Sequence, residues 1–138
     1  MKKVICVCTG NTCRSPMAAA FLQRALPDWD ISSAGLFASS GQGAAPEAVA
    51  AMRELGIDIS GHRSRQFSCG MAEGAVLVAL TGAHEERLRA LCPGADVLRY
   101  LASADVPDPF GGSFEFYRKT AFLLESGAGE LVKRLKFR

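Results

Sequence analysis

Hydrophobic residues in this chain form short continuous runs that alternate with longer amphipathic segments. The run KVICVC at 3–8 has no helical stripe, and GAVLVALT at 74–81 has the same character. Two further strands are predicted at 30–35 and 96–101. Strands that are apolar throughout, rather than at every second position, are typical of a parallel sheet covered on both faces.

Helices are predicted in the intervals between these strands. Ser15 and Pro16 indicate the start of the first helix, with Ser15 as its cap, and Pro27 ends it. Later segments with an apolar face at helical spacing are expected at 46–55, at 83–91 and from Ser113 onward. Gly127 and Gly129 predict an interruption or kink in the last of them.

Alternating strands and helices predict an α/β fold, organised as a single domain over residues 1–138. The chain is 49% hydrophobic, enough for one core, and too short for two ordinary domains. A net charge of +2 with mixed signs argues against nucleic acid as a partner. The first residues run directly into a strand pattern and no apolar run approaches a membrane span. We therefore expect a cytoplasmic protein without a membrane partner.

The chain has five cysteines, at positions 6, 8, 13, 69 and 92. This odd number, with three of them crowded near the start, favours reduced thiols over a disulfide framework. No C-x2-C or H-x3-H pair accompanies them, so we predict no metal site.

The loop after the first strand joins Cys8 to Arg14 across a glycine-rich turn. Ligands of parallel α/β sheets bind at the carboxyl ends of the strands, where Cys8 lies. Gly10 and Asn11 can adopt the positive φ needed to curl backbone N–H groups into an anion cradle. The same dipoles favour a thiolate at Cys8, and Arg14 supplies a planar clamp for phosphoryl oxygens. The loop therefore predicts attack on phosphorus and a phosphocysteine intermediate, whereas a core cysteine beside a solvated arginine is the structural alternative.

Attack by a thiolate requires an acid that protonates the leaving group. Asp108 precedes Pro109, which confines Asp108 to an extended backbone and fixes the direction of its side chain. Asp-Pro is also ordinary turn chemistry. Asp105 is the second candidate for the acid.

Four blocks in this order and spacing resemble the low-molecular-weight protein tyrosine phosphatase family: CTGNTCRSP (8–16), SAG (33–35), GIDISGHRSRQ (56–66) and DPF (108–110). The resemblance extends over essentially the whole chain. It implies one phosphatase domain with a three-layer α/β/α fold, a central four-stranded parallel sheet and a phosphate-binding loop after the first strand. It also implies phosphorylated protein substrates, inorganic phosphate as product, and no metal or other cofactor.

The resemblance also assigns roles to individual residues. Cys8 matches the nucleophile, Arg14 the group that binds the transferring phosphoryl, and Asp108 the general acid and later base. Ser15 matches the hydroxyl that supports the thiolate. The residues that would bind phosphate are Thr9, Gly10, Asn11, Thr12, Cys13, Arg14 and Ser15. The residues that would support the loop are Asn11, Ser33 and His62. His84 matches no catalytic position and is interpreted as a helix residue.

Two departures from tyrosine-directed members bear on substrate choice. Thr12 replaces a large aliphatic residue, and Phe110 is followed by Gly111 and Gly112 instead of paired aromatic residues. Both features resemble the bacterial protein arginine phosphatase branch. A narrow, polar phosphoarginine suits a smaller wall with a hydroxyl, and Phe110 would supply one apolar face. The alternative is a phosphotyrosine phosphatase in which Thr12 is neutral.

Two other classes of function are disfavoured. Thiol-dependent arsenate reductases share this loop but need a closely spaced resolving cysteine pair, whereas Cys69 and Cys92 are distant in sequence. A phosphoprotein-binding module without activity would lack the nucleophile, the arginine or the acid. Cys13 in the same loop predicts redox regulation, because it can capture a sulfenic acid on Cys8 as a disulfide.

Overall fold

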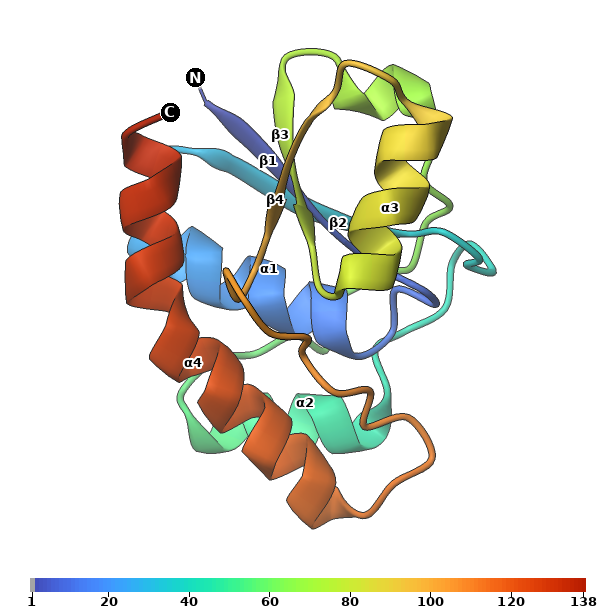
Figure 1. Cartoon of the computed structure of the whole chain (residues 1–138). Helices are drawn as coiled ribbons and strands as arrows, with labels where there is room; N and C mark the ends of the chain where they lie inside the picture. The colour runs from blue at the N-terminus through green and yellow to red at the C-terminus, as the bar shows by residue number, and fades with distance from the viewer. Residues whose placement is uncertain (1) are drawn as a thin grey trace.

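The computed structural model describes residues 2–138 and contains one four-stranded parallel sheet in the order β2-β1-β3-β4 (Figure 1). The strands are β1 (Lys3–Cys8), β2 (Asp30–Gly35), β3 (Ala75–Ala79) and β4 (Asp96–Arg99). β1 pairs with β2 on one side and with β3 on the other, and its apolar side chains are buried in the cores on both faces of the sheet. The four predicted strands are confirmed, although β4 ends two residues earlier than its pattern indicates.

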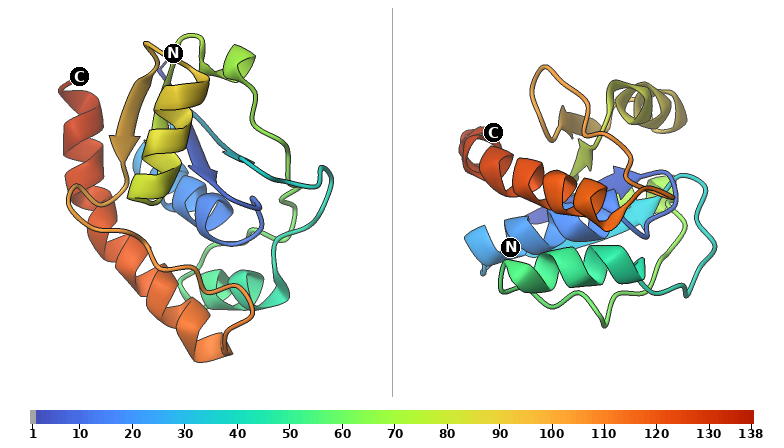
Figure 2. Two further views of the ribbon diagram at one scale, coloured as in Figure 1. Left: turned by 45° about the vertical axis from the view of Figure 1, so that its right-hand side comes forward. Right: turned by 90° about the horizontal axis from the view of Figure 1, so that it is seen from below.

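Helices cover both faces of this sheet (Figure 2). They are α1 (Arg14–Ala25), α2 (Pro46–Glu54), α3 (Gly82–Leu91) and α4 (Phe114–Lys136), with a short 3-10 helix η1 (Cys69–Ala72). α1 and α4 pack together on one face and α2 packs outside them on α4, whereas α3 packs on β3 and β4 from the other face. The three-layer α/β/α architecture expected from the family resemblance is confirmed.

The first and last helices differ from their sequence predictions. α1 begins at Arg14 after Cys13, and Ser15 lies inside its first turn instead of capping it. Ser113 does cap α4, because its hydroxyl accepts a hydrogen bond from the N–H of Phe116. α4 continues through Gly127 as one unbroken helix, so the interruption predicted there is wrong. A side chain at Gly127 would place its Cβ 2.7 Å from Leu101 Cδ2, so this glycine permits close packing.

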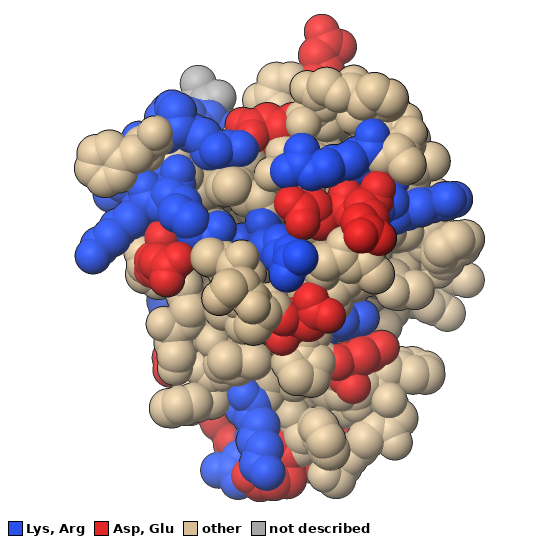
Figure 3. Space-filling view, in the orientation of Figure 1, with Lys and Arg blue, Asp and Glu red and all other residues tan. Residues whose placement is uncertain are grey.

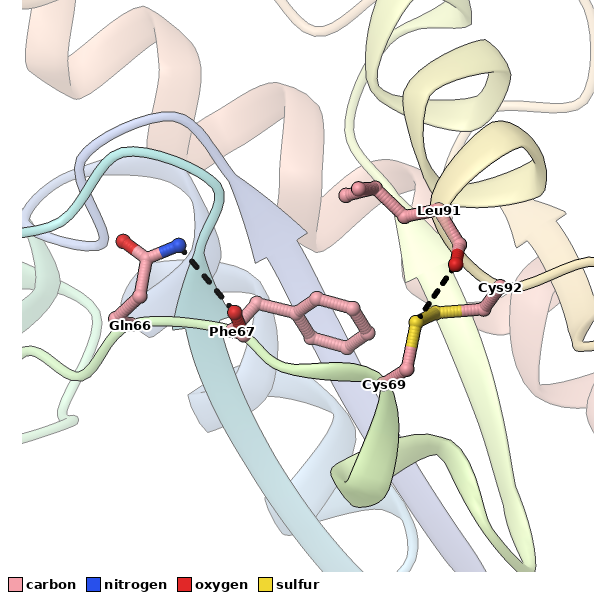
Figure 4. Close-up of a disulfide and its surroundings, with 5 residues drawn as sticks. All are labelled: Gln66, Phe67, Cys69, Leu91 and Cys92. Carbon is pink, nitrogen blue, oxygen red and sulfur yellow. Dashed lines mark hydrogen bonds between the residues drawn. A yellow bond between two sulfur atoms is a disulfide. The ribbon is translucent and has the colours of Figure 1, made fainter.

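The expectation that all five thiols are reduced is wrong for one pair. Cys69 in η1 and Cys92 after α3 form a disulfide with a Cα–Cα distance of 5.7 Å (Figure 4). They are 23 positions apart, but α3 returns the chain along β3 and brings them together. Both lie near Ala75 and Asp96, where β3 and β4 begin. Cys8 lies at the carboxyl end of β1, so this pair is not placed to resolve a bond on Cys8.

The surface carries both signs of charge side by side (Figure 3). Glu85, for example, pairs with Arg89 and with Arg99. This interspersed pattern agrees with the small net charge. Within the described part of the chain, no helix combines the length and apolar character needed to cross a membrane.

Candidate active site

The loop between β1 and α1 lines a cavity of about 280 Å³ at the carboxyl edge of the sheet. Asn11 has a φ of 58°, in the left-handed region that the sequence predicted, whereas Gly10, the other residue named for this turn, does not have a positive φ. Among residues 2–138, no acceptor pairs with the backbone N–H of Gly10, Thr12 or Cys13. These N–H groups and the start of α1 form the kind of cradle that binds an oxyanion.

Cys8 lies buried at the base of this cavity. Its Sγ is 2.9 Å from Ser15 Oγ and accepts a hydrogen bond of 3.3 Å from the N–H of Asn11. The Asn11 amide thus donates to the sulfur and the Ser15 hydroxyl lies within hydrogen-bond distance of it, so both groups hold Cys8 Sγ in position. Ser15 contacts the sulfur because α1 starts two residues earlier than predicted and turns this hydroxyl inward.

Asn11 connects the loop to two distant segments. Its Nδ2 donates to Ser15 Oγ (2.8 Å) and to Ser33 Oγ (2.9 Å), and its Oδ1 accepts from the N–H of Arg65 (2.9 Å). His62 Nε2 lies 2.7 Å from the Asn11 carbonyl, which can only accept, so Nε2 is the donor. Burial lowers the pKa of His62 against the opposing effect of this hydrogen bond. Asn11, Ser33 and His62, which the sequence named for loop support, therefore lie in one hydrogen-bond network. Arg65 also belongs to this network, although the sequence did not predict it.

Arg14 and Asp108 face each other across the cavity mouth. Arg14 is buried, donates from Nη1 to the Val106 carbonyl (3.0 Å) and has Nη2 3.5 Å from Asp108 Oδ2. Asp108 accepts the N–H of Phe110 and leaves 53% of its side chain exposed. Asp105 instead accepts the first N–H of α3 at 2.8 Å. Asp108, unlike Asp105, therefore lines the cavity that contains Cys8.

The walls of the cavity combine polar and aromatic residues. Thr12 lies on the loop itself, and the side chains of Phe37 and Phe110 are 71% and 74% exposed. The sequence predicted Thr12 and Phe110 here but missed Phe37 and its neighbour Gln42. Both follow β2, which ends at the same sheet edge as β1, so strand adjacency is the signal that would have found them.

Two further contacts involve the loop. His84, interpreted from sequence as an ordinary helix residue, has its Nε2 3.0 Å from Thr9 Oγ1. Cys13 is buried, with its Sγ 3.5 Å from the hydroxyl of Tyr117, and burial raises its pKa. Residues 2–138 contain no group of three or more His, Cys, Asp or Glu side chains placed to hold a metal ion.

Residues 3–138 match the family model described as low molecular weight phosphotyrosine protein phosphatase. A protein-arginine-phosphatase of Geobacillus stearothermophilus is 37% identical over 97% of this chain and 96% of its own. The crystal structure of the tyrosine phosphatase Wzb from Escherichia coli K30 in complex with sulphate superposes with a TM-score of 0.91. It is 29% identical and covers 97% of this chain and 98% of its own. A cysteine-to-serine mutant of the arginine phosphatase YwlE, with a phosphorylated active-site serine, has a TM-score of 0.87 at 35% identity. That match covers 97% and 95% of the two chains.

Proposed function

This chain belongs to the low molecular weight phosphotyrosine protein phosphatase family. We propose that it removes phosphoryl groups from protein side chains by hydrolysis and that phosphoarginine is its preferred substrate. The observation that supports catalysis is the arrangement of Cys8, Arg14 and Asp108 around one cavity. Related proteins carry both arginine and tyrosine phosphatase names, so the preference rests on the cavity walls.

The proposed reaction has two displacements at phosphorus. The Cys8 thiolate attacks phosphorus, the P–N bond of phosphoarginine breaks, and Asp108 transfers a proton to the departing nitrogen. Water then attacks the phosphocysteine while Asp108 accepts a proton, and the S–P bond breaks to release phosphate and the thiolate. Arg14 binds the equatorial oxygens in both steps, because its planar guanidinium matches two of them. The phosphorylated serine in the YwlE mutant supports a covalent route of this kind.

Thr12 is the observation that supports a phosphoarginine preference. It lies on the cavity wall with a small side chain, and its Oγ1 contacts Cys13 Sγ only at 3.8 Å, so the hydroxyl is free to bind a polar substrate. A guanidinium group offers several N–H donors to this hydroxyl and to Asp108, whereas a tyrosine ring offers none. Phe37 and Phe110 flank the mouth and favour the second candidate, phosphotyrosine, because aromatic faces stack on a flat ring.

The catalytic assignments are tested with three variants. We expect Cys8→Ser to lose turnover of p-nitrophenyl phosphate while it still binds vanadate, because the cradle persists without the thiolate. Asp108→Asn should lower kcat about 100-fold for substrates with poor leaving groups and much less for activated aryl phosphates. Asp105→Asn is the matched control and should behave like the parent protein. If Asp105→Asn shows the leaving-group dependence and Asp108→Asn does not, the acid is misassigned.

Substrate preference is tested by the ratio of kcat/KM for phosphoarginine and phosphotyrosine peptides. The parent protein should favour phosphoarginine, and Thr12→Ile should shift the ratio toward phosphotyrosine by about 10-fold, since it enlarges the apolar wall and removes a hydroxyl. A parent ratio that favours phosphotyrosine would leave the phosphatase assignment intact and reject the arginine preference.

A further inference from the structure

α3 lies on the face of the sheet opposite α1 (Figure 2). His84 of this helix contacts the phosphate loop. It lies in the first turn of α3, where its backbone N–H donates to the capping hydroxyl of Thr81. Its side chain is only 7% exposed, and its Nε2 lies 3.0 Å from Oγ1 of Thr9, the residue directly after Cys8. A buried imidazole is thus in direct contact with the catalytic loop.

The surroundings of His84 decide which ring nitrogen carries the proton. Burial and the Arg14 guanidinium outweigh Asp105 and Asp108 and hold the pKa of His84 at about 4, so the ring is neutral near pH 7. Its Nδ1 is buried and forms no hydrogen bond with any atom of residues 2–138. A buried N–H without an acceptor is rarer in proteins than an unpaired acceptor. The proton therefore belongs on Nε2, which donates to Thr9 Oγ1.

We propose that His84 is a positioning residue that acts through Thr9 and directs the Thr9 hydroxyl toward the phosphoryl group on Cys8. A hydroxyl that accepts from the imidazole must point its own hydrogen in another direction. Thr9 lines the cavity above Cys8, so the free direction is available to a nonbridging phosphoryl oxygen. This inference rests on the proposed phosphoryl transfer.

A fixed neutral donor is useful at this point of the site. The transferring phosphoryl group spreads negative charge over three equatorial oxygens, and the guanidinium of Arg14 binds two of them. A hydroxyl held in place before the reaction stabilises the remaining charge without reorganisation. A freely rotating Thr9 hydroxyl would donate only part of the time.

The test measures kcat for p-nitrophenyl phosphate in Thr9→Val, His84→Leu, the double variant and His84→Gln. Thr9→Val and His84→Leu should each lower kcat about 10-fold or more, since the hydrogen bond from the Thr9 hydroxyl to the charged phosphoryl oxygen is lost. The double variant should fall no further than the lower single variant, because both changes remove the same donor. His84→Gln should recover most activity, since its amide can donate to Thr9 as Nε2–H does. Thr120→Val removes a buried hydroxyl from α4 and is the matched control, with kcat unchanged.

A second measurement does not depend on any variant folding. Long-range 1H–15N correlation spectra of the parent protein should show the His84 proton on Nε2 at neutral pH. A proton on Nδ1 would overturn the inference. So would a double variant whose loss of kcat equals the product of the losses in Thr9→Val and His84→Leu, because the two residues would then act independently. An active parent protein that gives either result rejects only the role of His84. A parent protein without phosphatase activity rejects the proposed function, and this inference with it.

Discussion

Replacing Asn11 should damage both stability and catalysis, because one side chain holds three segments together. Asn11 is fully buried and its side chain makes three hydrogen bonds, to Ser15, Ser33 and the backbone N–H of Arg65. Its φ of 58° lies in the left-handed region, which an alanine adopts only at a cost. Asn11→Ala removes the hydrogen bonds and adds strain, whereas Asn11→Gly removes only the hydrogen bonds.

The expected magnitudes follow from these contacts. Three buried hydrogen bonds at about 1 kcal/mol each give a loss of about 3 kcal/mol for either variant. The left-handed backbone adds about 1 kcal/mol for alanine, after the greater flexibility of unfolded glycine is subtracted. For a domain of this size, a loss of about 3 kcal/mol lowers Tm by about 10 °C. Asn11→Ala should therefore be the less stable of the two.

Urea and thermal unfolding followed by circular dichroism would measure both differences, with kcat recorded on the same samples. Activity should fall at least 10-fold in both variants at temperatures where they remain folded, because Ser15 loses the partner that orients it toward Cys8. A Tm within 2 °C of the parent protein would refute the hydrogen-bond count. An alanine variant as stable as the glycine variant would refute the role assigned to φ.

Three shorter predictions concern other residues. Cys69→Ser should lower the free energy of unfolding by about 3 kcal/mol in urea titrations, since it opens a loop closed across 23 positions, with kcat within about twofold of the parent. Stability should fall by about 2–3 kcal/mol between pH 6.5 and 4.5, because the unfolded chain protonates His84 near its ordinary 6.5 and the folded chain only near 4. If the free energy of unfolding of His84→Gln falls as steeply with decreasing pH as that of the parent protein, His84 is not the cause. Mild peroxide followed by a thiol reductant should restore activity in the parent more fully than in Cys13→Ala, and an intact mass without loss of a hydrogen pair would reject a Cys8–Cys13 disulfide.

Local patterns in the sequence were sufficient to predict the elements and the anion-binding shape of the loop between β1 and α1. β1 and β3 are apolar on both faces because both are central strands, and their patterns reported this directly. The Cys8 to Arg14 spacing carried its meaning because a strand end, a glycine turn and a helix start coincide there. Each of these signals lies within about ten residues of chain. For that reason the strands were predicted to within two residues at each end.

Features were harder to predict where a residue can serve either its own helix or a contact elsewhere. Ser15 before Pro16 has the pattern of a helix cap, yet its hydroxyl contacts Cys8 Sγ and Asn11 Nδ2. The loop residue Cys13 precedes the first residue of α1 in place of Ser15, so the Ser15 hydroxyl is available to contact Cys8 Sγ. Similarly, Gly127 lowers helix propensity, but its packing against Leu101 outweighs that local cost.

Contacts between distant segments could not be read from periodicity, and α3 carries two of them. His84 in its first turn contacts Thr9, 75 positions earlier, and Cys92 after its last turn bonds to Cys69. The disulfide forms because α3 runs back along β3, from the carboxyl edge of the sheet to its amino edge. The His84 contact also requires β3 to lie beside β1, which brings the start of α3 next to the loop that follows β1. A different strand order would keep every helix and strand pattern of this sequence while it separated His84 from Thr9. The contact between α3 and the loop that follows β1 is thus a property of topology, and sequence patterns report it only once the strand order is known.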